Sequence, residues 1–358
     1  ANLLPSLRLA LARRAIPVLL LSASMGALAQ PSSQAQTLIR GIAPYQVFPR
    51  QDSEGRIPFV ALRPGELTAE VIRVADNLKV ANQVFSVVSA PQALAIERIP
   101  VGGDYTVTFR SGAAMQAFEH ILVGEIWVVG GGSNAYGSEG VLEPSVPQVR
   151  MFRDQWMEGQ DPFFPPGYIT VPPGKSVVTP WLRAARNYYQ RTGIPVGIMG
   201  LCAPNQPIDF FLDSSGTESP LFRRFVEQFG KGASVFCWFQ GEADISLERS
   251  RVYKNRLKAL TGALRRYSGN PQMLVVVVQL SHFLQAGMPA STGFGDVREM
   301  QRQYCMEDPN SMLIPSMPYP HRDALHLNAE GLRQVGSRIA QALDEARNNA
   351  GQPLWQGP

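Results

Sequence analysis

The spacing of apolar residues changes near residue 121, and this change divides the chain into two regions of different predicted structure. In residues 37–120, apolar side chains alternate with polar ones over short runs that end in Gly, Pro or Asp. Such runs are typical of β-strands that bury one face, and the breaks between them are turn signals. The pattern therefore predicts a small β-sandwich over residues 37–120.

Beyond residue 120, continuous apolar runs alternate with segments that have the spacing of helices. Five buried strands are expected, at residues 121–129, 196–202, 234–239, 273–280 and 311–316. Helical patterns lie between and after them, at residues 181–192, 219–229, 247–267, 296–306 and 329–346. This alternation is typical of a parallel sheet with helices on both faces. The sequence thus predicts a three-layer α/β/α domain over residues 121–348, with a long loop at 138–180 that is rich in Pro and Gly.

The first residues of the chain have the pattern of a secretion signal. Three arginines precede an apolar run at residues 15–29, which ends in the small-residue triplet Ala27-Leu28-Ala29. A basic region, an apolar region and a cleavage site of small residues define a secretory signal peptide, and the run is short for a membrane span. We therefore expect residues 1–29 to direct secretion or export to the periplasm, and the mature protein to have no integral membrane span.

Charge and cysteine content exclude several other classes of protein. The formal net charge is +4, and loss of a signal peptide with three arginines and no acidic residue leaves +1. A nearly neutral protein has no electrostatic reason to bind nucleic acid or an anionic membrane. Three cysteines, Cys202, Cys237 and Cys305, are too few for a disulfide scaffold and lack the spacing of a metal site. We expect Cys202 and Cys237, which lie in apolar runs, to be buried thiols.

Reactive side chains follow the ends of the five predicted strands. In open parallel sheets, ligands bind beyond the carboxyl ends of the strands. The five segments at these ends are Gly130-Gly131-Gly132-Ser133-Asn134, Ala203-Pro204-Asn205-Gln206, Gln240-Gly241-Glu242-Ala243-Asp244, Ser281-His282 and His321-Arg322-Asp323-Ala324-Leu325-His326. We therefore expect a hydroxyl, imidazole, carboxylate and amide groups along one edge of one sheet.

Ser133 and His326 are the candidate nucleophile and base. Three glycines before Ser133 permit a tight turn that exposes its hydroxyl beside backbone N–H groups. A phosphate-binding loop is the alternative, but the chain lacks its Lys-Ser/Thr ending and its G-x-G-x-x-G spacing. His120 precedes the first strand of the sheet, at the wrong end. His326 follows Asp323 by three residues, so one short loop presents carboxylate and imidazole together, although a helix-capping loop has the same spacing.

The ordered motifs resemble one enzyme family. Five segments carry the resemblance, at residues 123–134, 195–199, 238–244, 297–301 and 323–326. Together they resemble the SGNH hydrolases, specifically the sialate O-acetylesterase and acetylxylan-esterase-like branch, whose motifs include Gly-Gln-Ser-Asn, Trp-x-Gln-Gly-Glu and Arg-Glu-x-Gln. A β-domain ahead of the hydrolase domain also occurs in that family. The resemblance implies an SGNH (flavodoxin-like) fold.

The same resemblance implies a reaction and a set of site residues. It implies hydrolysis of O-acetyl esters of carbohydrates without a metal ion or organic cofactor. Ser133 would be the nucleophile, His326 the base and Asp323 the residue that orients His326, with Glu242 as the alternative carboxylate. The oxyanion donors would be the Ser133 N–H, the Gln240 side chain and a group in the loop after Cys202, which we assign to Asn205. The candidate substrate-binding residues are Asn134, Glu242 and Arg298.

The chain departs from the family pattern at two places. Gly132 stands where the family has Gln, and Pro204-Asn205-Gln206-Pro207-Ile208 stands where it has Gly-Gly-Thr-x-Ile. Because proline has no N–H, an oxyanion donor is lost if the family's glycine corresponds to Pro204 and kept if it corresponds to Asn205. The departures put efficiency and substrate in question more than the fold.

Two other functions stay open at this point. An α/β-hydrolase carboxylesterase shares the order Ser, Asp, His, but it requires G-x-S-x-G, whereas residues 131–135 read Gly-Gly-Ser-Asn-Ala. A non-catalytic carbohydrate-binding protein descended from an esterase would have the same fold and would not turn over an aryl acetate. The motifs select neither a particular sugar nor an oligomeric state.

Overall fold

The structure is a computed structural model that describes residues 37–164, 168–212, 219–229, 231–281 and 293–348. The predicted signal peptide, residues 1–29, and His282 lie outside these ranges.

The N-terminal region consists of β-strands that bury alternate residues. Its strands are β1 (Ile39–Arg40), β2 (Val47–Gln51), β3 (Glu54–Ala61), β4 (Gly65–Arg73), β5 (Leu78–Val87), β6 (Gln92–Pro100), β7 (Gly102–Ser111) and the first half of β8 (Ala114–Gly131). β3 pairs antiparallel with β1, β2 and β6, and β4 pairs antiparallel with β5 and β7. The rings of Phe59 on β3 and Phe109 on β7 meet edge to face, 4.8 Å apart, in a shared core. The alternation predicted for this region is present, and its status as a separate β-sandwich domain stays a prediction.

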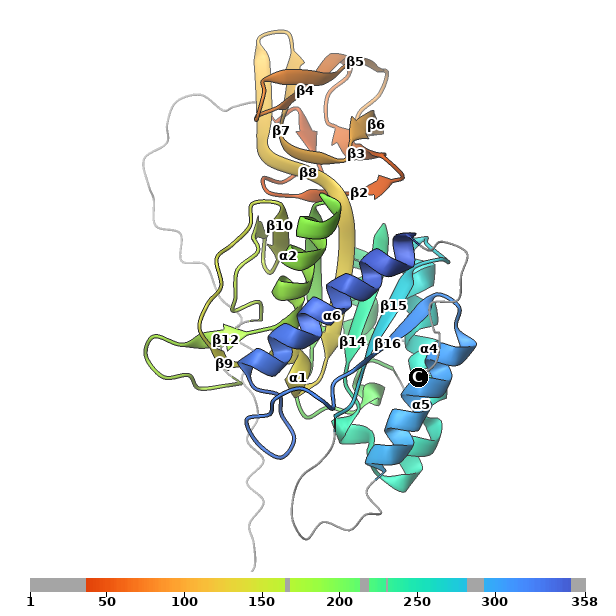
Figure 1. Ribbon diagram of the computed structural model, residues 1–358. Helices are drawn as coiled ribbons and strands as arrows, with labels where there is room; N and C mark the ends of the chain where they lie inside the picture. Colours follow the sequence, from red (N-terminus) through yellow and green to blue (C-terminus); the bar gives the residue numbers. More distant parts are fainter. Residues whose placement is uncertain (1–36, 165–167, 213–218, 230, 282–292, 349–358) are drawn as a thin grey trace, which may run out of the picture. The chain divides into compact units, whose positions relative to one another are not determined.

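Strand β8 continues from this region into a large, mainly parallel sheet (Figure 1). The order of strands there is β11 (Trp156–Glu158), β10 (Val149–Phe152), β13 (Val196–Cys202), β8, β14 (Ala233–Phe239), β15 (Leu274–Gln279) and β16 (Ser311–Pro315). All of these pairings are parallel except that of β10 with β11. The five predicted strands are confirmed. β10 and β11 were not predicted, because they are short and lie in the segment expected to be a loop.

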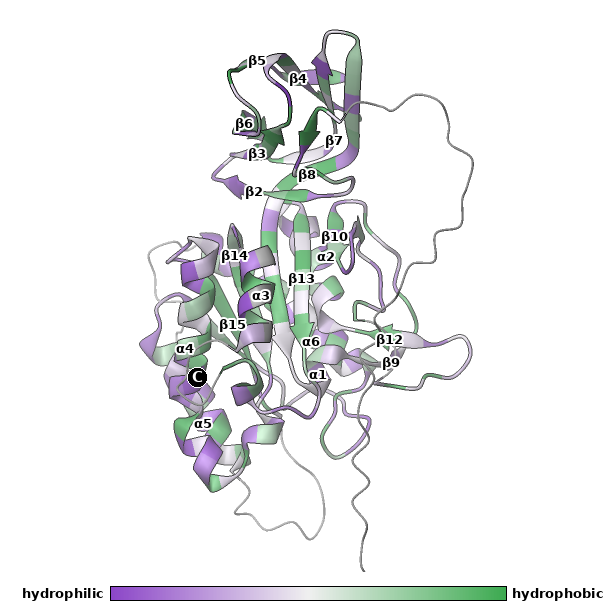
Figure 2. Cartoon of the chain, turned by 180° about the vertical axis from the view of Figure 1, so that it is seen from behind, coloured by the Kyte–Doolittle hydropathy of each residue, from purple (hydrophilic) through white to green (hydrophobic). Residues whose placement is uncertain are grey.

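Helices pack on both faces of this sheet because successive residues of β8 point to opposite sides. Trp127 and Val129 share a core with α2 (Pro180–Thr192) and α6 (Ala329–Asn348). Ile126 and Val128 share the other core with α3 (Pro220–Phe229), α4 (Leu247–Ser268) and α5 (Phe294–Glu307). Figure 2 shows largely hydrophobic strands beside helices of mixed character, as this layering requires.

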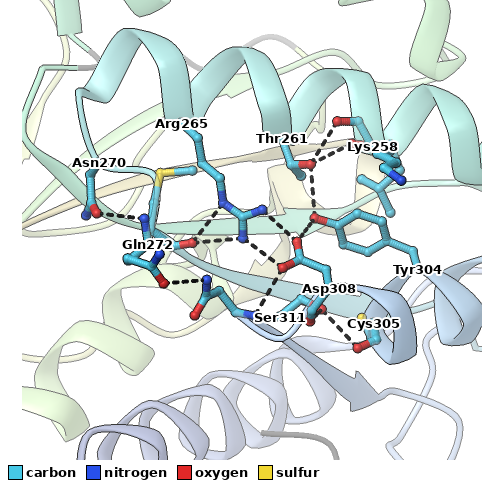
Figure 3. Close-up of polar contacts among 12 residues, drawn as sticks. Lys258, Thr261, Arg265, Asn270, Gln272, Tyr304, Cys305, Asp308 and Ser311 are labelled. Carbon is cyan, nitrogen blue, oxygen red and sulfur yellow. Dashed lines mark hydrogen bonds and ion pairs between the residues drawn. The ribbon is translucent and has the colours of Figure 1, made fainter. Parts of the chain in front are cut away.

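A polar network fastens α4, α5 and β16 at the amino end of the sheet (Figure 3). Asp308 accepts hydrogen bonds from both terminal nitrogens of Arg265, at 2.8 and 3.1 Å, and from the Tyr304 hydroxyl, at 2.7 Å. Arg265 also donates to the backbone oxygen of Met273, just before β15. Because Asp308 precedes β16, this network lies at the end of the sheet opposite to the candidate site and stabilises the scaffold.

Candidate active site

Ser133 lies where β8 passes directly into a single helical turn, α1 (Ser133–Tyr136). Gly131 has a φ of +146°, and a Cβ on this residue would overlap the Phe239 carbonyl. The N–H of Gly132 donates to that same carbonyl oxygen at 2.9 Å. Because Phe239 ends β14, the glycine turn seats Ser133 at the carboxyl edge of the sheet, where its side chain is largely enclosed.

His326 and Asp323 lie in a tight loop between β16 and α6. The Arg322 N–H donates to the His326 backbone oxygen at 2.9 Å, which folds the loop back on itself. The Oδ1 atom of Asp323 accepts hydrogen bonds from the backbone N–H groups of Leu325 (2.8 Å) and His326 (2.7 Å). A short polar side chain that bonds its own downstream backbone is typical of such turns, so Asp323 shapes the loop that carries His326.

The serine, the histidine and the aspartate form a continuous chain of hydrogen bonds. His326 Nε2 is 2.9 Å from Ser133 Oγ, and His326 Nδ1 is 3.0 and 2.9 Å from the two carboxylate oxygens of Asp323. Desolvation alone would raise the pKa of Asp323, but the bonds from Leu325, His326 N–H and the His326 ring outweigh it and lower that pKa. An imidazole placed between a hydroxyl and an ionised carboxylate can take the hydroxyl proton and be stabilised as a cation.

Asn134, next to Ser133 in sequence, bonds the loop that carries His326 and also bonds Glu242. Its Nδ2 donates to Glu242 Oε1 at 2.7 Å and to the Leu325 backbone oxygen at 3.3 Å, while its Oδ1 accepts from Leu327 N–H at 2.9 Å. Desolvation raises the pKa of Glu242, and the bond from Asn134 opposes that shift. Asn134 and Glu242 therefore lie next to the site, and the polar atoms of Asn134 are used within the protein. A substrate-binding role for either residue stays a prediction.

The segment after β13 turns at Pro204 and Asn205. The Gln206 N–H donates to the Ala203 oxygen at 3.2 Å, and Asn205 has a φ of +62°. Proline at the second position and a positive φ at the third are the signature of a type II turn, which tolerates Asn. Within the described ranges, neither the Ser133 N–H nor the Asn205 N–H donates a hydrogen bond to the protein. Both N–H groups therefore remain candidates for the oxyanion donors that the resemblance implies.

Gln240 is close to the nucleophile turn but its amide is already bonded. A Cβ on Gly132 would lie 3.6 Å from Gln240 Cγ. The Gln240 Nε2 donates to the Gln206 backbone oxygen at 3.1 Å and to Asp244 Oδ2 at 2.6 Å. Since an amide has two hydrogens, no donor is left over in this arrangement. The role of Gln240 as an oxyanion donor stays a prediction.

Arg298, on α5, bonds to the backbone beyond β15 instead of standing free. Its Nη1 donates to the Leu280 oxygen and, at 3.2 Å, to the Ser281 oxygen, and burial lowers its pKa. Nearby, Ser281 Oγ is 2.7 Å from His321 Nε2. Sequence reasoning had placed both residues at this edge without pairing them. The sequence did contain a signal for the Ser281–His321 contact, because His321 lies in the same short loop as His326 and Ser281 follows the adjacent strand.

A mainly parallel α/β fold with a serine, a histidine and an aspartate bonded at the carboxyl edge of its sheet is an arrangement that ester hydrolases use. Residues 123–345, more than half of the chain, match the carbohydrate esterase family described as sialic acid-specific acetylesterase. The chain belongs to this family and is a carbohydrate O-acetylesterase. The resemblance inferred from its motifs is thereby confirmed.

Solved structures show the same fold at low sequence identity. The crystal structure of a carbohydrate acetylesterase from Xanthomonas citri has a TM-score of 0.64 and 15% identity, over 87% of this chain and 74% of that chain. A protein from Arabidopsis thaliana has a TM-score of 0.50 and 21% identity, over 61% of this chain and 97% of that chain. No curated protein matches the chain in sequence.

The described ranges contain neither a candidate membrane-spanning helix nor a candidate metal site. None of the helices there is long and apolar enough to cross a membrane. No three His, Cys, Asp or Glu side chains in the same ranges are grouped so that they could hold a metal ion.

Cys237 and Cys305 are buried, Cys202 is half-buried, and all three are free thiols.

Proposed function

We propose that this protein is exported and removes acetyl groups from carbohydrates, with Ser133 as nucleophile, His326 as general base and Asp323 as the residue that orients His326. The observation that carries the proposal is the bonded chain from Ser133 Oγ to His326 Nε2, at 2.9 Å, and from His326 Nδ1 to Asp323. Export rests on the signal-peptide pattern of residues 1–29. Residues 37–120 would form a β-sandwich domain ahead of a hydrolase domain at 121–348.

The reaction follows from the positions of these groups. As Ser133 Oγ attacks the acetyl carbonyl carbon, His326 Nε2 takes the hydroxyl proton, and the Ser133 and Asn205 N–H groups stabilise the oxyanion. His326 then returns the proton to the sugar oxygen, the ester bond breaks, and the acetyl group stays on Ser133. A water molecule, deprotonated by His326, then attacks the acetyl carbon. The bond from this carbon to Ser133 Oγ breaks, His326 returns the proton to Ser133 Oγ, and acetate leaves. Asp323, whose pKa is lowered, is ionised at neutral pH and stabilises the imidazolium.

The contacts favour Asp323 over Glu242 as the third member of the triad. Asp323 is within 3.0 Å of His326 Nδ1, whereas the hydrogen bond of Glu242 is made with Asn134. The family description points to O-acetylated sialic acid as a first substrate to test. The solved structure from Xanthomonas citri that has a similar fold is a carbohydrate acetylesterase, so other acetylated sugars should also be tested.

The test is acetate release from O-acetylated sialic acid, acetylated xylan and acetylated peptidoglycan by the purified protein. Ser133→Ala should lower the rate by several orders of magnitude while the protein stays folded. A serine-directed phosphonate should be found by mass spectrometry on Ser133. An adduct on Ser281, the other serine bonded to a histidine, would contradict the assignment. A protein that binds these sugars but does not turn over an aryl acetate would support the carbohydrate-binding alternative.

A further inference from the structure

A buried carboxylate, Asp244, contacts the loop formed by residues 203–208, which carries Asn205 and is called the Asn205 loop below. Asp244 ends the short helix η2 (Glu242–Asp244) and is 1% exposed. Its Oδ2 accepts hydrogen bonds from the Ile208 N–H at 2.9 Å and from Gln240 Nε2 at 2.6 Å. Ile208 begins the short helix η1 (Ile208–Phe210), three residues after Asn205. Asp244 therefore holds the far end of the Asn205 loop.

Gln240 holds this loop at a second point, nearer to Asn205. The second amide hydrogen of Gln240 goes to the backbone oxygen of Gln206, the residue that follows Asn205, at 3.1 Å. Gln240 is itself fixed, because its backbone oxygen accepts from the Tyr253 hydroxyl at 2.7 Å and from Gln301 Nε2 at 3.0 Å. The loop is thus tied at two points to a rigid, buried support.

These two bonds restrain the turn that carries the Asn205 N–H. The peptide that contains this N–H lies within the turn that Gln206 closes. A positive φ is unfavourable for residues other than glycine, although Asn tolerates it, so the turn needs support from outside. Loss of either bond would let the turn relax and rotate this N–H away.

We propose that Asp244 is a positioning residue of the reaction, which acts through Gln240 and the Ile208 N–H to aim the Asn205 N–H at the oxyanion. The inference rests on the proposed function. Desolvation raises the pKa of Asp244, while Gln240 and the Ile208 N–H oppose that shift by bonding its carboxylate. The support therefore depends on an accepting oxygen at this place, which Asn also provides and Ala does not.

A positioning role has a kinetic signature that a general structural role lacks. The oxyanion exists in the transition state and not in the bound ester, so a misaligned donor lowers kcat and leaves KM nearly unchanged. Asp244→Ala should lower kcat ~10²-fold, the usual effect of one lost oxyanion donor. The affinity for a transition-state analogue, such as a trifluoromethyl ketone, should fall by a similar factor. Asp244→Asn should restore most of both.

Asp209 offers a matched control next to the same loop. It lies on η1, one residue after Ile208, and pairs with Arg256 at 3.1 Å. Asp209→Ala removes a carboxylate next to the loop without removing either anchor, so kcat and analogue affinity should be unchanged. If Asp244→Ala does not fold, as judged by thermal melting, Asp244→Leu fills the same volume without an accepting oxygen and should give the same loss of kcat.

Several results would overturn the inference. One is an Asp244→Ala protein that melts normally and keeps its kcat, and another is a loss carried by KM with analogue affinity unchanged. An Asn variant as slow as the Ala variant would also contradict it, since Asn keeps an accepting oxygen. Ser133→Ala separates this failure from failure of the proposed function. If Ser133→Ala is inactive while Asp244→Ala is fully active, the positioning role alone is wrong.

Discussion

The side-chain oxygen of Asn134 accepts a hydrogen bond of 2.9 Å from the backbone N–H of Leu327, although the two residues are 193 positions apart in the chain. Asn134 follows the candidate nucleophile Ser133, and Leu327 follows the candidate base His326. The bond therefore helps to fix the distance between Ser133 and His326. The Asn134 amide group completes the connection with bonds to Glu242 and to the Leu325 oxygen.

The first prediction concerns this connection. Asn134→Ala should lower kcat ~10²-fold with KM little changed, because displacement of a catalytic group by about 1 Å has an effect of that size. Steady-state kinetics on an acetylated sugar measures both constants, and the rate of phosphonate labelling of Ser133 should slow in parallel. Glu242→Gln, which keeps an accepting oxygen for Asn134, is the matched control. A change in KM alone would instead support the substrate-binding role predicted from the sequence.

The second prediction separates the two carboxylates near His326. Asp323→Asn should keep the loop but misorient His326 or favour its wrong tautomer, with a loss of ~10⁴ in kcat by analogy with serine triads. Glu242→Gln should have a much smaller effect, because Glu242 bonds Asn134 and not the ring. Measured on the same substrate, a reversed order of the two losses would assign the third place in the triad to Glu242.

The third prediction concerns pH and stability. Asp161 accepts hydrogen bonds from the N–H and the hydroxyl of Thr179, which precedes α2, and burial raises its pKa to about 7. The folded protein then binds this proton more tightly than the unfolded chain, where an aspartate has a pKa of ~3.9. Stability from this group is therefore full below pH ~4, is lost as the pH rises to about 7, and is constant above it.

The Asp161→Asn variant should remove this pH dependence. Its melting temperature should fall less than that of the wild type between pH ~4 and ~7, with the difference greatest near neutral pH. Asp209→Asn serves as a control at a partly exposed carboxylate. If the melting temperatures of wild type and Asp161→Asn change equally with pH over this range, Asp161 does not titrate as described.

The fourth prediction concerns a buried ion cluster at the amino end of the sheet. Glu125 accepts hydrogen bonds from Trp127 Nε1 and the Tyr188 hydroxyl, both at 3.0 Å, and pairs with Arg50 at 2.9 Å and Arg347 at 2.8 Å. Burial opposes ionisation, but Arg347, Trp127 and Arg50 together lower the Glu125 pKa. Glu125→Gln would leave the partly buried Arg50 and Arg347 without a counter-charge, which costs up to ~3–5 kcal/mol, the effect of breaking a fully buried pair. Urea unfolding should show this loss, while kcat of the folded fraction should be unchanged because the cluster lies away from Ser133.

The contacts within the candidate site that depend on local spacing could be predicted from the sequence. Ser133 was proposed from three glycines at a strand end, and the pair Asp323 and His326 from a separation of three residues, and the structure places the three side chains within hydrogen-bond distance. These signals are local, since a glycine turn and a short loop have nearly the same geometry wherever they occur. The five parallel strands were found for a similar reason, because buried strands are continuous apolar runs.

The sequence was insufficient where partners are distant or elements are short. Asn134 was expected to bind substrate, yet its partners Glu242 and Leu327 are more than 100 residues away, and side-chain direction at that range depends on tertiary packing. Gln240 is a similar case, because the fate of its two amide hydrogens depends on Gln206 and Asp244 together. β10, with four residues, is too short for its periodicity to be distinguished from that of a loop.

The last prediction concerns Pro204 and Asn205, where the chain departs from its family. Asn205 has a positive φ, as the family's glycine would permit, and its N–H donates no hydrogen bond within the described ranges. We therefore expect the oxyanion donor to be kept at Asn205, with a side chain added at the entrance to the acyl site. The enzyme should be a normal acetylesterase that discriminates steeply against longer acyl groups.

Two glycine variants, each assayed with acetate, propionate and butyrate esters of one alcohol, distinguish a crowded acyl site from a missing donor. Asn205→Gly should raise the butyrate rate relative to the acetate rate, because it removes the side chain and keeps both the N–H and a φ that glycine adopts freely. Pro204→Gly should leave that ratio unchanged. If the donor were instead missing at position 204, Pro204→Gly would supply a new N–H and raise all three rates, by up to ~10²–10³. A general gain from Pro204→Gly, with no change for Asn205→Gly, would therefore place the lost donor at Pro204.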